Sequence, residues 1–151
     1  MALHHDLLDQ AAHLAAKEPN KPKQASLRRA VSATYYALFH LLVDEAVMRF
    51  VKGPGASALR HLLRRAFDHG EMKRISKAFS AGTLPTSLAP ALNSPIPPNL
   101  RLTAKAFVGL QEARHEADYD LSRRFARAEV NDLIADTRDA LQSWSAVRTS
   151  E

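Results

Sequence analysis

The stretch ASLRRAVSATYYALFHLLVDEAV, residues 25–47, decides the fold, because its apolar residues surround most of a helix and do not follow one side. A helix of this kind is covered by neighbours on several sides, so we expect it at the centre of a helical bundle. Period-two runs of β-branched residues, which would indicate strands, are missing from the sequence. The expected fold class is therefore all-α.

Apolar residues recur at helical spacing on both sides of this stretch, and Pro or Gly residues mark the breaks. This pattern predicts an up-and-down bundle of about five helices. A long Pro-rich loop over residues 81–99 joins the third expected helix to the fourth. Ser122 is expected to cap the last helix. The expected helices cover residues 3–17, 24–51, 56–80, 100–117 and 122–147.

Composition limits the classes to which the protein can belong. The chain has 151 residues, of which 46% are hydrophobic and 25% charged, as in a globular protein with one domain over residues 1–151. The absence of Cys excludes disulfides, thiol nucleophiles and thiolate metal sites. No apolar stretch is long enough to cross a membrane, and no signal-peptide pattern is present. We therefore expect a cytoplasmic protein that does not bind membranes.

The charge of the chain is positive and unevenly distributed. Lys and Arg total 21 against 16 Asp and Glu, a formal net charge of +5, which favours an anionic partner. Cations gather in residues 21–29 and again in residues 60–77. For residues 60–77 the pattern favours an ordinary solvated helix face over a binding surface.

The central helix also carries a line of polar side chains. Arg29, Ser32, Tyr36 and His40 are spaced at i, i+3, i+7 and i+11, so they fall close to one line on the helix. Their guanidinium, hydroxyl, phenol and imidazole groups suit a cleft for phosphate or a nucleotide. In the alternative interpretation, Tyr36 and His40 lie at the edge of the core and bind a carbonyl or water. The pattern alone favours this second interpretation, because buried Tyr and His are common.

A second informative stretch is LQEARHEADYDLSRR, residues 110–124, where the fourth helix is expected to end. Arg114 lies at the edge of its apolar face, and Asp118 follows at the spacing of a helical ion pair. Arg114 is therefore either a structural partner of Asp118 or a functional cation. The seven His residues form no metal-ligand pattern, and no Gly-rich phosphate loop is present. Neither a metal nor another cofactor is expected.

These two stretches resemble the HEPN domains of prokaryotes, and the resemblance covers most of the chain. It implies an all-α bundle, often a homodimer, that acts with a minimal nucleotidyltransferase in toxin–antitoxin or defence systems. Many members are metal-independent RNases with an R-x(4–6)-H motif, in which the Arg engages phosphate and the His transfers protons. The resemblance rests on Arg28-Arg29-x-x-Ser32-x-x-Tyr35-Tyr36-Ala37-x-Phe39-His40 and on Arg114-x-x-Ala117-Asp118-Tyr119.

The chain departs from that motif, because Tyr119 stands five residues after Arg114 where the motif has His. The nearest imidazole in sequence is His115, which a helix rotates by about 100° from Arg114. A tyrosine, with an ordinary pKa of about 10, is a poor base at neutral pH. Nothing in this segment therefore replaces the family His.

Two hypotheses follow, of which we favour the first. In the first, the domain binds RNA, a nucleotide or a partner protein without turnover. In the second, it is a metal-independent endoribonuclease in which Arg114 holds the scissile phosphate, His40 or His115 supplies the imidazole and Tyr119 assists. The expected cleft residues are Arg29, Ser32, Tyr36, His40, Arg114 and Tyr119, with Asp118 as a further binding residue. The apolar circumference of the central helix adds the expectation of a homodimer.

Overall fold

The computed structural model describes residues 2–82, 84, 86, 89–91 and 95–149. These residues form six α-helices and one 3₁₀ turn and contain no strand, which confirms the all-α prediction. The elements are α1 (Leu3–Ala15), α2 (Gln24–Phe50), α3 (Ser57–Arg64), α4 (His69–Ala81), η1 (Ala89–Ala91), α5 (Pro98–Tyr119) and α6 (Arg127–Thr149).

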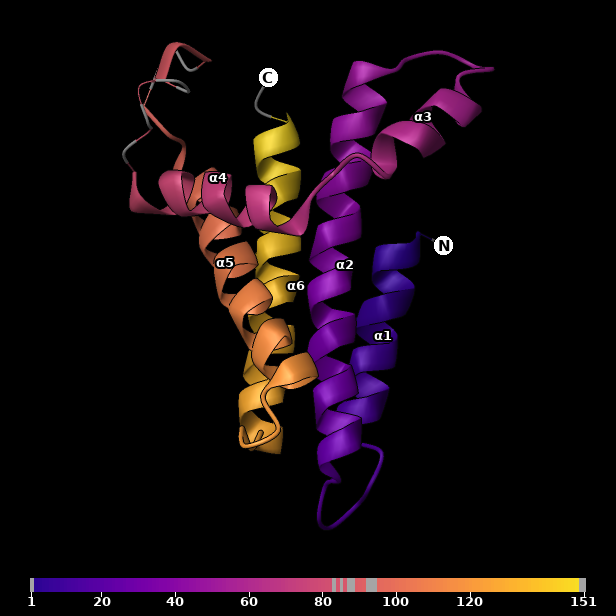
Figure 1. Cartoon of the computed structure of the whole chain (residues 1–151), viewed down its shortest axis with the longest axis vertical. Helices are drawn as coiled ribbons and strands as arrows, with labels where there is room; N and C mark the ends of the chain where they lie inside the picture. Colours follow the sequence, from indigo (N-terminus) through magenta and orange to yellow (C-terminus); the bar gives the residue numbers. More distant parts are fainter. Residues whose placement is uncertain (1, 83, 85, 87–88, 92–94, 150–151) are drawn as a thin grey trace.

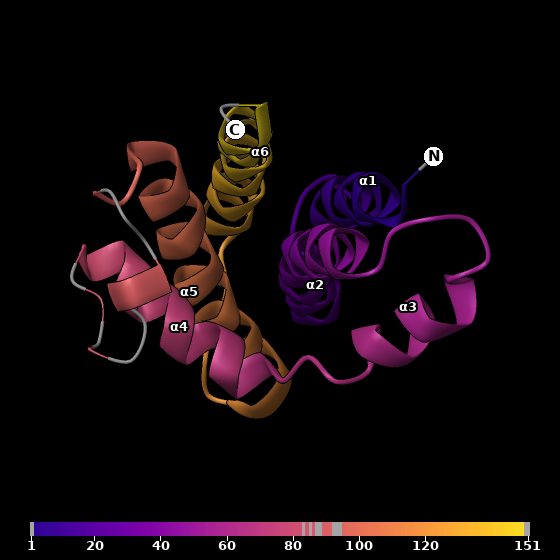
Figure 2. The same ribbon diagram turned by 90° about the horizontal axis from the view of Figure 1, so that it is seen from above.

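Helices α1, α2, α5 and α6 run along the long axis of the molecule, each in the opposite direction to the one before it (Figure 1). Helix α4 crosses α5, whereas α3 lies on the other side of the molecule, beside α2 (Figure 2). Helix α2 contacts α1, α3, α5 and α6. Its apolar circumference is therefore explained by neighbours within one chain, and no second copy is needed to cover it.

The core lies along α2 and consists of two groups of buried side chains. One group joins α1, α2 and α6 and includes Leu8, Val31 and Ile134. The other joins α2, α5 and α6 and includes Leu38 and Phe107. In α6, Val130 and Ile134 are buried, and Leu133, Leu141 and Trp144 pack against the core.

The prediction of one helix over residues 56–80 is wrong, because α3 ends at Arg64 and α4 starts at His69. Asp68 is the physical cause of the break. Its side chain accepts a hydrogen bond of 2.9 Å from the backbone N–H of Glu71 and so caps a new helix. Asp68 and Glu71 have the spacing of a capping box. This break adds a helix to the five expected.

Several other expected boundaries also shift. Helix α1 ends at Ala15 and not at residue 17, and α5 begins with Pro98, which suits the first position of a helix. Helix α6 begins at Arg127 and not at Ser122, because the Ser122 hydroxyl and N–H both donate to Asp120 in a turn. Of the expected loop over residues 81–99, residues 83, 85, 87–88 and 92–94 lie outside the described residues.

Arg28 fixes the C-terminal end of α5 against α2. Its guanidinium donates to the carbonyl oxygens of Ala117 and Asp120, both at 2.9 Å, to that of Glu116 at 3.4 Å and to that of Arg123. These carbonyls lie at or just beyond the end of α5, where a helix leaves its last acceptors unsatisfied. Capping by Arg28 holds the last turn of α5 beside the N-terminal turns of α2.

Candidate functional site

Helices α2 and α5 bring together four of the predicted site residues. Arg114 Nη2 donates to the Tyr36 hydroxyl at 3.1 Å, and the Ser32 hydroxyl donates to Asp118 Oδ1 at 2.7 Å. Arg114 Nε lies 2.8 Å from Asp118 Oδ2, so the predicted ion pair exists. The N–H of Nε does not point at that oxygen, however, and Nε is buried without a well-aligned acceptor. The pair is therefore an electrostatic contact and not a hydrogen bond.

Aromatic rings surround the Arg114 guanidinium. Its Cζ lies 5.6 Å from the ring centres of Tyr35 and Tyr36 and 5.9 Å from that of Tyr119. The side chain is 15% exposed, whereas that of its partner Asp118 is 31% exposed. Burial is the strongest influence on the pKa of Arg114 and lowers it, but Tyr36, Asp118 and the other tyrosines together raise this pKa above its usual value. Arg114 is thus a permanent cation with aromatic walls.

One end of the Arg114 guanidinium is open to a ligand. Nη1 has no hydrogen-bond partner among the described residues, and only Arg114 Nε and Trp144 Nε1 are buried side-chain atoms without a partner there. Nη1 therefore reaches solvent. Buried polar groups normally have a hydrogen-bond partner, so the unpaired end of this largely buried guanidinium is available to a ligand.

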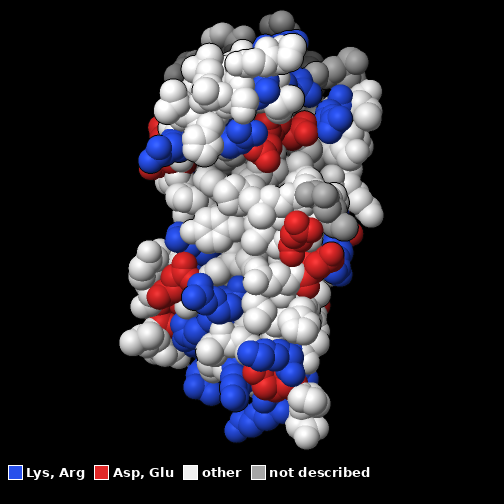
Figure 3. Space-filling model, turned by 90° about the vertical axis from the view of Figure 1, so that its right-hand side faces the viewer, with Lys and Arg blue, Asp and Glu red and all other residues white. Residues whose placement is uncertain are grey.

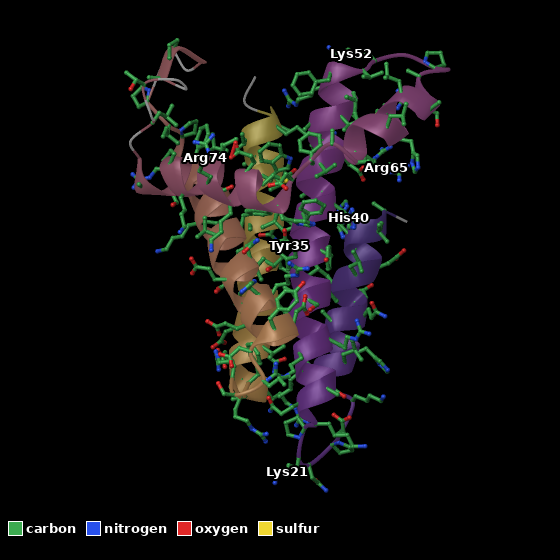
Figure 4. All side chains as sticks on the ribbon, viewed as in Figure 1. Lys21, Tyr35, His40, Lys52, Arg65 and Arg74 are labelled. Carbon is green, nitrogen blue, oxygen red and sulfur yellow. The ribbon has the colours of Figure 1, made fainter. Side chains whose placement is uncertain are left out.

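An imidazole that the sequence analysis did not single out joins the same group. Nδ1 of His69, the first residue of α4, lies 2.5 Å from the hydroxyl of Tyr35, which is fully buried. Tyr35 lies on the side of α2 that faces α5 (Figure 4). The His69 ring also stacks on Phe39, with centres 4.2 Å apart, and meets Tyr36 edge-on at 6.1 Å. His69 and Arg114 thus share Tyr35 and Tyr36 as neighbours. We call Ser32, Tyr35, Tyr36, His69, Arg114 and Asp118 the Arg114 cluster.

Burial and charge act together on His69. Burial lowers its pKa first, and the positive charges of Arg114 and His40 lower it further, while Asp68 opposes them. Burial also raises the pKa of Tyr35 far above its usual range. Near neutral pH, His69 is therefore an uncharged imidazole beside a protonated phenol.

The other predicted residues lie around this cluster and not inside it. The His40 ring is half-buried and 6.0 Å from that of Tyr36, so it borders the cluster. His115 is exposed and packs against Tyr119, which is itself 66% exposed, with ring centres 5.1 Å apart. Arg29 is exposed on α2. Neither His40 nor His115 has a hydrogen bond or ion pair with Arg114 in the described part of the chain.

The two basic regions of the sequence differ in whether their cations have partners within the chain. In residues 60–77 most cations bind within the chain, which supports the interpretation as an ordinary helix face. Arg60 donates to the carbonyls of Val51 and Gly53, Arg64 pairs with Asp44, Arg74 with Glu71, and Lys73 and Lys77 with Glu112. In residues 21–29, Lys21, Lys23 and Arg29 are exposed. Arg124 is also exposed and lies next to this region, because Arg28 donates to the carbonyl oxygen of the preceding residue, Arg123. We call these four residues the basic end; positive charge gathers at this lower end of the molecule in Figure 3.

Two hollows lie elsewhere on the surface. One, of about 390 Å³, lies between α5 and α6 and is lined by Ala106, Gly109 and Leu133 among others; the second, of about 400 Å³, lies near His4 and Trp144. Neither of these two hollows includes a residue of the Arg114 cluster. No group of His, Asp and Glu suited to a metal ion occurs among the described residues. In the same part of the chain, no helix has both the length and the hydropathy to cross a membrane.

No family model, curated protein or solved structure matches this chain. The chemistry of the Arg114 cluster is therefore the basis for assigning a function. Sequence spacing found the contributions of α2 and α5 to it, but it missed Tyr35 and His69. The signal that could have found His69 is the Asp68–Glu71 pair, which starts a helix at that position.

Proposed function

We propose that the chain is a HEPN-like helical domain of a toxin–antitoxin or defence system, and that it binds single-stranded RNA through a phosphodiester at the Arg114 cluster. The observation that carries this proposal is the Arg114 guanidinium, which has aromatic walls and one N–H group open to solvent. Arginine matches the geometry of phosphate oxygens, and the Tyr36 hydroxyl, which accepts from Arg114, keeps its own proton to donate.

The charge of the cluster favours RNA over a free nucleotide. Asp118 offsets the charge of Arg114, and His69 is neutral near neutral pH, so the cluster carries little net charge. A phosphodiester with one negative charge fits this balance better than a triphosphate with several. The exposed rings of Tyr119 and His115 lie on the same helix as Arg114 and give unpaired bases a surface for stacking.

The experiment is a binding titration with a short, labelled, single-stranded RNA of mixed sequence. A hydrogen bond to a charged group contributes about 1.5–3 kcal/mol, so Arg114→Ala is expected to weaken binding by about tenfold or more. Arg138→Ala, which removes an exposed cation of α6, is the matched control and should have little effect. If the two variants bind RNA equally well, the proposal is wrong.

Asp118→Asn separates a binding role of Arg114 from a structural one. The asparagine keeps an oxygen for the Ser32 hydroxyl but removes the charge that competes with phosphate for Arg114. A binding role predicts that Asp118→Asn tightens RNA binding, whereas Arg114→Ala weakens it. A structural bridge predicts that both substitutions lower the stability of the fold and that neither changes the affinity.

Metal-independent RNA cleavage is the second candidate function, and the His40 ring, whose centre lies 6.0 Å from that of Tyr36 at the border of the cluster, favours it. In this function, Arg114 would hold the scissile phosphate and an imidazole would transfer protons. The test is incubation of the purified protein with total RNA in EDTA. If the wild type cleaves RNA and Arg114→Ala abolishes the cleavage, the protein is an RNase. If the RNA stays intact, the protein binds RNA without cleaving it.

The proposed partners are a second copy of the chain and a minimal nucleotidyltransferase. Met48, Phe50, Leu59 and Leu62, from the end of α2 and from α3, are large apolar side chains that are more than half exposed, which supports a protein contact there. Light scattering at micromolar concentration is expected to give the mass of a dimer, and a monomer would count against it. A nucleotidyltransferase encoded by a neighbouring gene is expected to copurify with the chain.

A further inference from the structure

The hydrogen bond between Tyr35 and His69 fixes where the proton of the imidazole lies. The Tyr35 hydroxyl is buried, and among the described residues it has no hydrogen bond except that with Nδ1 of His69. If Nδ1 carried a proton and donated it, the hydroxyl proton would have no acceptor, which is costly in a buried site. Tyr35 therefore donates and Nδ1 accepts, so the proton of neutral His69 is on Nε2.

The Nε2–H group of His69 is available to a ligand. It has no hydrogen-bond partner in the described part of the chain, and it is not one of the two buried side-chain atoms without a partner there. It therefore reaches solvent. The ring is held by stacking on Phe39 and by the bond to Tyr35, so its position does not depend on the ligand.

We infer that His69 is a second phosphate-binding residue of the Arg114 cluster, which donates from Nε2 while Tyr35 holds the ring in that tautomer. This inference rests on the proposed function and deepens it. It places donors from three helices around one ligand: Arg114 on α5, Tyr36 on α2 and His69 on α4. A neutral imidazole donor adds a hydrogen bond without adding charge, which suits a phosphodiester.

The same geometry gives His69 a binding role and not an acid–base role. Its Nδ1 lone pair is occupied by the Tyr35 proton, and its Nε2 carries a proton, so the neutral ring has no free lone pair to act as a base. Donation of the Nε2 proton would require Tyr35 to supply another and become a phenolate, which its burial opposes. The inference therefore predicts that His69 contributes to RNA binding and supplies no base for cleavage.

The experiment compares RNA affinity in the wild type, in Tyr35→Phe and in the double variant Tyr35→Phe with His69→Phe. The double variant keeps two aromatic rings and leaves no buried polar atom unsatisfied, so its stability is expected to stay close to that of the wild type. Its affinity for the labelled RNA should fall by about tenfold, because the Nε2–H donor is lost. In Tyr35→Phe the donor remains but its tautomer is not fixed, so a smaller loss is expected.

Nitrogen NMR of wild-type His69 tests the tautomer directly and does not depend on the folding of any variant. The expected result near neutral pH is a neutral ring with the proton on Nε2, and a mixture of tautomers in Tyr35→Phe. A proton on Nδ1 would overturn the inference. So would unchanged affinity in the double variant when Arg114→Ala binds weakly, and this outcome would leave the proposed function intact. If the wild type does not bind RNA, both proposals are wrong.

Discussion

The arginines at the lower end of the bundle and the arginine in its middle use their guanidinium groups in opposite ways. Arg28 donates to four backbone carbonyls around the end of α5. Arg127 donates to Ala15 at 2.9 Å, to Pro19 at 3.4 Å and to Glu18 beyond the end of α1. Arg114 makes one hydrogen bond, to Tyr36, and one ion pair, to Asp118. We call Arg28 and Arg127 the capping arginines.

The difference teaches how to recognise an arginine that is available for binding. The capping arginines direct their N–H groups at carbonyls that a helix end leaves unsatisfied, so their positive charge serves the fold. Arg114 keeps Nη1 in solvent and is surrounded by rings that compete weakly for its hydrogen bonds. Burial alone would not separate the two kinds, because Arg28, Arg114 and Arg127 are all partly buried.

The largest expected effect is that of Arg28→Ala on stability. The substitution leaves several carbonyls at the end of α5 without their charged donor, so the free energy of unfolding should fall by about 2–3 kcal/mol. Chemical denaturation measures the loss, and Arg29→Ala, an exposed neighbour on the same helix, is the control. RNA affinity of the folded Arg28→Ala protein should stay unchanged. Equal stability of the two variants would remove the distinction between capping arginines and surface cations.

A smaller effect is expected on the pH dependence of stability. The pKa of His69 is lower in the folded chain than its ordinary value of 6.5, so the unfolded chain takes up the proton first as the pH falls. Stability should therefore decrease from about pH 6.5 downward until the folded ring is also protonated. Urea denaturation at pH 7.5 and at pH 5.5 measures this decrease.

The double variant Tyr35→Phe with His69→Phe is the control for that measurement, because it removes His69 and keeps His4, whose pKa burial also lowers. Its stability should vary less over the same pH interval. If the double variant and the wild type lose the same stability between pH 7.5 and pH 5.5, His69 is not coupled to the fold as its place beside Arg114 predicts.

The smallest effect is expected for Arg74→Ala. Arg74 pairs with Glu71 three residues earlier on α4, and both side chains are mostly exposed, so water already screens the pair. The midpoint of thermal unfolding and the RNA affinity should both match the wild type within error. A clear loss of affinity would show that residues 60–77 bind RNA after all and would shift the site away from Arg114.

The sequence predicts the helices of the bundle well, because hydrophobic periodicity is a local property of the chain. It also predicts the Arg114–Asp118 pair, since residues four apart on a helix are neighbours. The place of Ser32 and Tyr36 beside that pair depends on how α2 packs against α5. The spacing of Ser32 and Tyr36 on one helix does not identify their partners. The packing of α2 against α5 brings Ser32 to Asp118 and Tyr36 to Arg114.

The contribution of α4 could not be predicted by the same reasoning. Apolar residues continue through residues 56–80, so periodicity predicts one helix and places His69 in its interior. The cap at Asp68 ends that continuity, and only the resulting change of direction brings His69 to Tyr35. The role of Tyr35 could not be predicted either, because it depends on a partner 34 residues away in the chain.

The central claim is that RNA binds at the Arg114 cluster and not at the basic end. NMR titration of the labelled protein with a short single-stranded RNA tests this claim most directly, because it reports on both regions in one experiment. We predict that the Arg114 side-chain N–H signals and the ring signals of Tyr36 and His69 shift most. Shifts confined to Lys21, Lys23, Arg29 and Arg124 would contradict the account.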